Sequence, residues 1–211
     1  MRCEAPTTAT LVGFISGVRS MGPSCRRGVV APRERTRAWV TRARRLSLQA
    51  RRLSNARKAG ANYQNNRLAA VEARENGFDD AILLTQAGKV AEATGAALMM
   101  VRDGQLVVPP VTDGVLESIT RRSVLELYAR EYGRPAVERS IDRTELYVCD
   151  EILICGSAEE VTPVIAVDRL KVGDGMPGPI TKTLQRLFFV AARGDDPAFA
   201  GSLTPVYGAR A

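Results

Sequence analysis

The amino-acid composition of this 211-residue chain changes abruptly at residue 58, and the change limits what each part can fold into. Residues 1–57 contain thirteen arginines and only two acidic residues, a net charge of +11, and they show no sustained helical or strand period. Residues 58–211 carry a net charge of −4 and show regular apolar spacing. The sequence therefore predicts a poorly ordered, arginine-rich leader over 1–57 and a folded part from residue 58 onward.

Three roles are open for the predicted leader. Its arginines would suit the phosphates of a nucleic acid or another anionic surface. Against that role, 1–57 lacks lysine, and Phe14 and Trp39 are its only aromatic residues, so platforms for stacking bases are missing. An organelle transit peptide is also arginine-rich and poor in acids, although this segment would be long for one. A leader with no evolved role is the alternative that we favour, and nucleic acid is not an expected partner.

Missing and isolated residue types exclude several kinds of chemistry. The chain contains no histidine, which excludes a Ser-His-Asp triad, a Cys-His pair and a histidine-bearing zinc site. Cys3, Cys25, Cys149 and Cys155 form no CxxC pair. We therefore expect buried free thiols in a reduced, cytoplasmic protein, and no metal site. No apolar run reaches the ~18 residues of a membrane span, so we expect no membrane partner.

The folded part alternates short strands with amphipathic helices. The dipeptide Asp103-Gly104 stands between two apolar runs and predicts a tight hairpin. The periodicity predicts helices over 62–76, 120–132, 142–148 and 180–192, and strands over 81–85, 90–93, 97–102, 105–108, 137–140, 151–155, 164–167 and 170–172. The expected fold class is α+β, a mixed but largely antiparallel sheet with flanking helices. Its domain would cover 58–194, followed by a C-terminal tail over 195–211.

Residues 173–178 spell GxGxxG between a predicted strand and a predicted helix, which is the pattern of a dinucleotide site. Pro177 and Pro179, however, stand where backbone N–H groups would have to point at a pyrophosphate, and no parallel strand follows the helix. We therefore favour a glycine-rich turn.

Five short strings carry a more specific signal because they occur together and in a fixed order. They are KAGANY at 58–63, VAEATG at 90–95, SITR at 118–121, GSAEEVTPV at 156–164 and GPITK at 178–182. In this order and spacing they resemble the class IV aminotransferases, which use pyridoxal 5′-phosphate (PLP), and they are most similar to the branched-chain amino acid aminotransferase branch. The resemblance runs from about Arg57 to Phe189. It implies the large domain of the D-amino acid aminotransferase-like fold, in which the sheet forms a pseudo-barrel.

The resemblance also implies a role for individual residues. Lys58 would form the Schiff base with the cofactor and then move a proton as a free amine. Glu92 would keep the pyridine nitrogen protonated, and Tyr63 would hydrogen-bond the phenolate oxygen. The backbone N–H of Ala158 would meet the substrate carboxylate. The implied cofactor-binding residues are Lys58, Tyr63, Glu92, Gly95, Ile119, Thr120 and Ser157, of which Ile119 and Thr120 begin a helix whose N-terminus favours the phosphate. Taken singly, Glu92 could equally be a solvent-facing strand charge and Thr120 a plain N-cap.

The implied activity is transamination of branched-chain or other aliphatic amino acids with 2-oxoglutarate, by a homodimer. D-amino acid transamination and a lyase reaction in the same fold are alternatives. The family places a small domain ahead of the lysine, where it supplies an arginine for the phosphate. Residues 1–57 do not resemble that domain, so a truncated or out-of-frame 5′ end, and an inactive relative that at most binds PLP, are further alternatives. Ala96 and Ala97 stand where the family usually has a polar pair, and Ala93 where it commonly has glycine.

Overall fold

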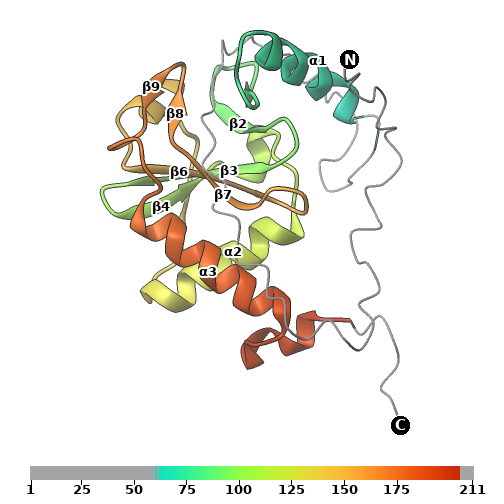
Figure 1. Cartoon of the computed structure of the whole chain (residues 1–211), viewed down its shortest axis with the longest axis vertical. Helices are drawn as coiled ribbons and strands as arrows, with labels where there is room; N and C mark the ends of the chain where they lie inside the picture. The colour runs from blue at the N-terminus through green and yellow to red at the C-terminus, as the bar shows by residue number, and fades with distance from the viewer. Residues whose placement is uncertain (1–59, 61, 205–211) are drawn as a thin grey trace, which may run out of the picture. The chain divides into compact units, whose positions relative to one another are not determined.

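The computed structural model describes residue 60 and residues 62–204 of the chain (Figure 1). The leader predicted over 1–57, with Cys3 and Cys25, lies outside the described residues. Lys58 and the last part of the predicted tail also lie outside them.

The described residues form three α-helices, three short 3₁₀ helices and nine strands. In chain order they are α1 (Asn62–Glu75), β1 (Ile82–Leu84), β2 (Val90–Ala93), β3 (Ala97–Arg102), β4 (Gln105–Val108), η1 (Val111–Asp113), α2 (Ile119–Tyr132), β5 (Val137–Glu138), η2 (Arg143–Tyr147), β6 (Glu151–Gly156), β7 (Glu160–Val164), β8 (Ala166–Val167), β9 (Leu170–Lys171), α3 (Pro179–Arg193) and η3 (Pro197–Ser202).

Strand β3 is the centre of a seven-stranded sheet. It pairs along its length with β6, from Ala97 opposite Cys155 to Val101 opposite Glu151. Because β6 occupies one edge of β3, β2 and β4 pair with the other edge, β2 near the start of β3 and β4 near its end. Strand β7 extends the sheet beyond β6, and β8 and β9 form a separate two-stranded sheet. Among the described strands only the short β4–β5 pair is parallel, so the predicted antiparallel character is confirmed.

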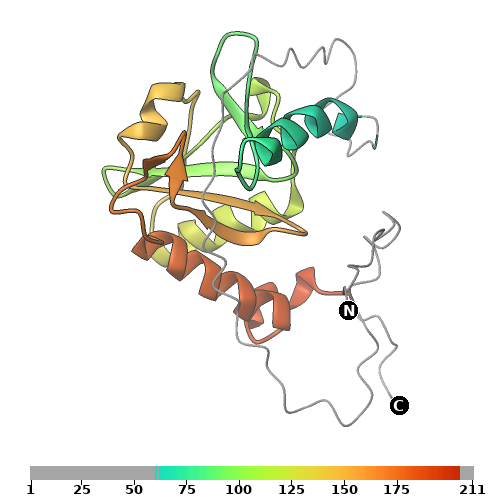
Figure 2. The same cartoon turned by 45° about the horizontal axis from the view of Figure 1, so that its top comes forward.

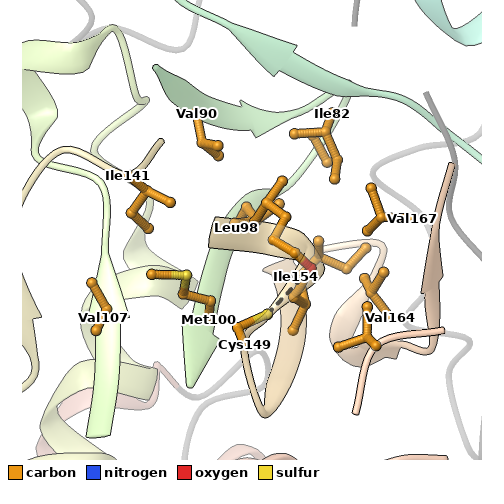
Figure 3. Packing of buried hydrophobic residues seen from close by; sticks show 14 of the residues in the cluster. Ile82, Val90, Leu98, Met100, Val107, Ile141, Cys149, Ile154, Val164 and Val167 are labelled. Atoms are coloured by element: carbon orange, nitrogen blue, oxygen red, sulfur yellow. Dashed lines mark hydrogen bonds between the residues drawn. The ribbon is translucent and has the colours of Figure 1, made fainter. Parts of the chain in front are cut away.

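Both faces of β3 are buried, which explains its uninterrupted apolar sequence. Leu98 and Met100 point into one hydrophobic cluster, which includes residues of β1, β2, η2 and β8 (Figure 3). Met99 and Val101 point into a second cluster on the opposite face. That face is covered by α2 and α3, which lie side by side across the sheet (Figures 1 and 2). The predicted sheet with flanking helices is therefore confirmed.

Several element bounds differ from the predicted ones for local reasons. The sequence pattern starts a strand at residue 164, whereas the observed β7 already ends at Val164. Strand β7 includes Pro163, which it tolerates because it pairs only with β6 and is an edge strand. The short helix predicted after Asp142 is a 3₁₀ helix, and Glu145 accepts the backbone N–H of Asp142 at 3.0 Å as the capping pattern predicts. The 3₁₀ helix η3 lies within the segment predicted as a tail.

The glycine-rich segment 173–178 ends at a helix N-terminus that a side chain already occupies. The carboxylate of Glu151 accepts the backbone N–H of Ile180 at 3.0 Å and that of Thr181 at 2.8 Å. These are the amide groups that a pyrophosphate would need. The glycine-rich turn is therefore the interpretation that the structure supports, because the helix carries its own internal anion.

We expect Gly178→Ala to destabilise the fold by about 3 kcal/mol, since it removes the hydrogen bonds of a buried carboxylate. A Cβ atom on Gly178 would lie 2.0 Å from Cδ of Glu151, so the cap would have to leave its place. Urea unfolding gives the change in free energy. Gly201→Ala is the matched control, because its Cβ would meet no atom within 4 Å. Equal stability of the two variants would contradict the capping role.

Candidate active site

Two turns that are far apart in the sequence meet at one end of the β3–β6 pair. The register places Ala97 opposite Cys155, so the β2–β3 turn with Gly95 lies beside the turn that follows β6. A Cβ atom on Gly156 would stand 3.3 Å from the carbonyl oxygen of Gly95, which shows how closely the two backbones approach. Ser157 and Ala158 are exposed in the second turn. The structure thus brings three predicted site residues, Gly95, Ser157 and Ala158, to the same edge.

Glu92 lies three residues before Gly95, in strand β2 opposite Ala97. Its Oε2 atom accepts the backbone N–H of Leu116 at 3.1 Å. Burial raises the pKa of this carboxyl from 4.5 to about 7, and the Leu116 hydrogen bond opposes that rise. Glu92 forms no ion pair with any described residue. It is therefore a largely buried acid that would gain from a cationic partner, and not the solvent-facing strand charge of the alternative interpretation.

The segment that contacts Glu92 leads directly into α2. Ser118 is the N-cap of this helix, and its Oγ atom accepts the N–H of Arg121 at 3.3 Å. The sequence pattern predicts a helix that starts at Thr120, whereas the observed helix begins at Ile119. Thr120 is therefore not its N-cap. The N–H groups of Ile119 and Thr120 have no acceptor within the helix, as in any first turn. Two donors and the positive end of a helix therefore follow Leu116 by a few residues.

Tyr63 lies in the first turn of α1 and is partly exposed. One turn later on the same helix, the buried Asn66 donates from Nδ2 to the carbonyl oxygen of Thr94 at 3.0 Å. Residues three apart share a helix face, so Tyr63 is on the side of α1 that approaches the β2–β3 turn. Lys58 lies outside the described residues, only four positions before the start of α1.

Two groups of residues at this site are absent from the sequence-based prediction. The first joins α1 to the β2–β3 turn: Thr94 accepts from Asn66 and donates from its hydroxyl to Asp80, whose pKa burial raises. The second is Arg121, a residue of the first turn of α2 whose side chain is buried. Neither has a local sequence signal, because Asp80 belongs to an acidic pair and Arg121 to an arginine pair, and both look like surface charge.

The remaining predicted features of the described part are simple to place. Cys149 and Cys155 are free and buried, and burial raises the pKa of each thiol to about 12, as expected for unreactive cysteines. Among the described residues, no cluster of histidine, cysteine, aspartate or glutamate could hold a metal ion. Within the same residues, no helix has both the length and the apolar character that a bilayer-spanning segment requires.

The largely buried Glu92 carboxyl predicts that the stability of the ligand-free protein depends on pH. Its pKa in the folded state lies above the unfolded value, so the folded state holds the proton more tightly. The contribution of this group to the free energy of unfolding is fully present below about pH 4.5 and is lost as the pH rises through about 7. The loss should be about 3 kcal/mol. Urea unfolding of wild type and Glu92→Gln between pH 4.5 and 8 measures this loss. The free energy of unfolding of the glutamine variant should rise relative to that of wild type as the pH rises. A pH-independent difference would contradict the assignment.

Comparison with known families supports what the fold and the site indicate. The family model described as "Amino-transferase class IV" matches residues 30–167, well over half of the chain. The chain therefore belongs to the class IV aminotransferases. The match begins at residue 30, whereas the resemblance carried by the short strings begins only at about Arg57.

Individual relatives come from one branch of this family. The chain is 44% identical over 149 residues to the probable branched-chain-amino-acid aminotransferase of Aquifex aeolicus, a match that covers 71% of this chain and 48% of that protein. The chain thus spans about half the length of this curated relative.

Solved structures from the same branch share the fold. The branched-chain amino acid aminotransferase of Thermobaculum terrenum, in its PLP-bound holo form, superposes with a TM-score of 0.74 at 42% identity, over 81% of this chain and 55% of that one. The T.th. branched-chain amino acid aminotransferase, complexed with N-(5′-phosphopyridoxyl)-L-glutamate, gives a TM-score of 0.74 at 35% identity, over 82% of this chain and 57% of that one. The predicted fold of the large domain is confirmed.

Proposed function

We propose that this chain carries the large, PLP-binding domain of a branched-chain amino acid aminotransferase, with 2-oxoglutarate as the amino-group acceptor. Membership of the class IV family supports the reaction type. The Thermobaculum terrenum structure, a PLP form, supports the cofactor, and the T.th. enzyme's complex with a glutamate adduct supports the acceptor pair glutamate and 2-oxoglutarate. The observation that carries the proposal is Glu92, a largely buried carboxyl without a cationic partner among the described residues.

The residues of the site fit PLP in charge and in shape. A protonated pyridine nitrogen is the kind of cation that Glu92 lacks, and pairing would offset the unfavourable burial of the carboxylate. The first turn of α2 offers the N–H groups of Ile119 and Thr120 to the phosphate, with the hydroxyl of Ser157 as a further donor. Gly95 lacks a side chain, and no atom lies within 4 Å of the place where its Cβ would stand, which suits a turn against which a flat ring rests.

Bound PLP supplies an electron sink for the charge left at the substrate Cα when its proton departs. The protein's own residues do the remaining work. Lys58 would be the lysine that holds the cofactor, and its free amine would move the proton at Cα. Tyr63 would donate a hydrogen bond to the phenolate oxygen, and Ala158 would offer its backbone N–H to the α-carboxylate. Glu92 would hold a positive charge on the ring nitrogen, where that charge stabilises the electrons left at Cα.

The proposal includes a cytoplasmic homodimer and aliphatic L-amino acids as substrates. D-amino acid transamination, a lyase reaction and a chain that binds PLP without turnover are the competing outcomes. Ala96 and Ala97, which replace a polar pair usual in the family, are both buried, and Ala97 is the first residue of β3. The residue types at this turn therefore differ from the family pattern. A direct comparison of amino-acid substrates tests which of them the site prefers.

Absorbance spectroscopy tests the proposal on the full chain. Added PLP should give the visible band of a lysine-bound cofactor, and L-leucine should convert that band to the pyridoxamine form in the absence of any 2-oxo acid. Addition of 2-oxoglutarate should restore it. Conversion by D-leucine instead would assign D-amino acid transamination, and a stable band with no conversion would identify a protein that binds PLP without turnover. Failure to form the band would refute the proposed function.

A further inference from the structure

Arg121 is buried, in contrast to its neighbour on the same helix. Only 9% of its side chain is exposed, whereas Arg122 is 83% exposed and forms an ion pair with Glu126 one turn away. A buried guanidinium loses hydration, and this is unfavourable unless its donors find partners. An apolar side chain would fill the same volume without that penalty, so the charge at Arg121 calls for a physical explanation.

The guanidinium of Arg121 ties the first turn of α2 to two strands. Its Nη2 atom donates to the carbonyl oxygen of Pro109, directly after β4, at 3.0 Å. The same atom lies 3.2 Å from Oε2 of Glu138 in β5. These bonds fix where the helix begins relative to the sheet. The Nε atom is buried and has no partner among the described residues.

Arg121 also acts on β6, the strand that leads to Ser157, the other proposed phosphate donor. It acts electrostatically on the thiol of Cys155 in β6, where it opposes the larger effect of burial on the pKa of that thiol. Cys155 precedes Ser157 by two residues. Arg121 is thus linked to both segments that we assign to the phosphate: it belongs to the first turn of α2, and its charge acts on a residue close to the end of β6.

We propose that Arg121 is a positioning residue for the cofactor phosphate. Through its contacts with Pro109 and Glu138, the guanidinium holds the first turn of α2 so that the N–H groups of Ile119 and Thr120 face the phosphate. This inference rests on the proposed function and goes beyond it, since the resemblance assigns the phosphate to Ile119, Thr120, Ser157 and an arginine of the small domain and gives Arg121 no role. Arg121 acts through the helix and does not need to contact the phosphate itself.

Affinities for two cofactor forms test this role. The dissociation constants of PLP and of pyridoxal, which lacks the phosphate, are measured by absorbance titration on the full chain and on Arg121→Met, Arg121→Lys and the matched control Arg122→Met. Arg121→Met should weaken PLP at least about tenfold more than it weakens pyridoxal. Arg121→Lys should show a smaller loss of the same kind, and Arg122→Met should match wild type. Inorganic phosphate should compete with PLP less well in Arg121→Met than in wild type.

The ratio of the two affinities separates positioning from general support of the fold. Equal losses for PLP and pyridoxal in the Arg121 variants would overturn the inference, because a merely structural role does not distinguish the two ligands. If Arg121→Met does not fold, Arg121→Lys keeps the charge and provides the same ratio. A wild-type chain that binds neither ligand would refute the proposed function and this inference together. A wild type that binds PLP, with an unchanged ratio in the variants, would refute the inference alone.

Discussion

Replacement of Glu92 by glutamine is expected to lower kcat/KM for L-leucine by about 10²- to 10³-fold, the range seen when a preorganised electrostatic partner is removed from an active site. Glutamine keeps the shape of the side chain and can still accept the Leu116 N–H, which is 3.1 Å from Oε2 in the wild type. It cannot hold a positive charge on the ring nitrogen. The loss should therefore fall on the rate of proton removal from Cα and leave PLP bound, which a single-turnover absorbance experiment with L-leucine measures.

The same substitution should have the opposite effect on the ligand-free fold. Because burial raises the pKa of Glu92 to about 7, loss of the carboxylate should stabilise the protein above that pH. A variant that is more stable and less active cannot be explained by general damage. Glu117→Gln is the matched control, since Glu117 is exposed and adjacent to Leu116. Equal activity of wild type and Glu92→Gln at pH 8 would exclude the pyridine-nitrogen role.

Local signals in the sequence account for most of the strands at the site. The bounds of β2, β3 and β4 agree with the prediction. The two-residue turn Asp103-Gly104 defines the hairpin and so fixes the register in which β3 pairs with β4. The predicted start of α2 is one residue late because Ser118 and Thr120 are both suitable caps. Only the geometry shows that Ser118 holds the position.

Contacts between distant segments have no comparable signal. Gly95 and Gly156 are neighbours because β3 pairs with β6, and no spacing within either turn contains that information. The resemblance to a family includes both glycines, which end the string at 90–95 and begin the string at 156–164. It did not include Glu151, whose carboxylate caps α3, or Arg121, because a single charged residue next to other charges does not reveal whether it is buried.

The Lys58→Ala protein is expected to lose covalent attachment of the cofactor completely and to fall at least about 10³-fold in kcat, because no other group would both bond to PLP and move the proton at Cα. Sodium borohydride reduces a lysine-bound cofactor to a stable secondary amine, so peptide mapping by mass spectrometry of reduced wild type should find the added mass on Lys58. Lys182→Ala is the control: Lys182 belongs to another of the family-like strings and is exposed in the first turn of α3.

The borohydride experiment tests covalent attachment of PLP at one lysine and does not depend on the affinity for PLP alone. Noncovalent binding of PLP can persist in Lys58→Ala, since Glu92 and the first turn of α2 remain, but its absorbance should resemble that of the free aldehyde and borohydride should leave no mass on the chain. The Lys182→Ala protein should be labelled on Lys58 as wild type is. Recovery of the reduced cofactor on a different lysine, or full turnover by Lys58→Ala, would show that the resemblance places the catalytic amine at the wrong residue.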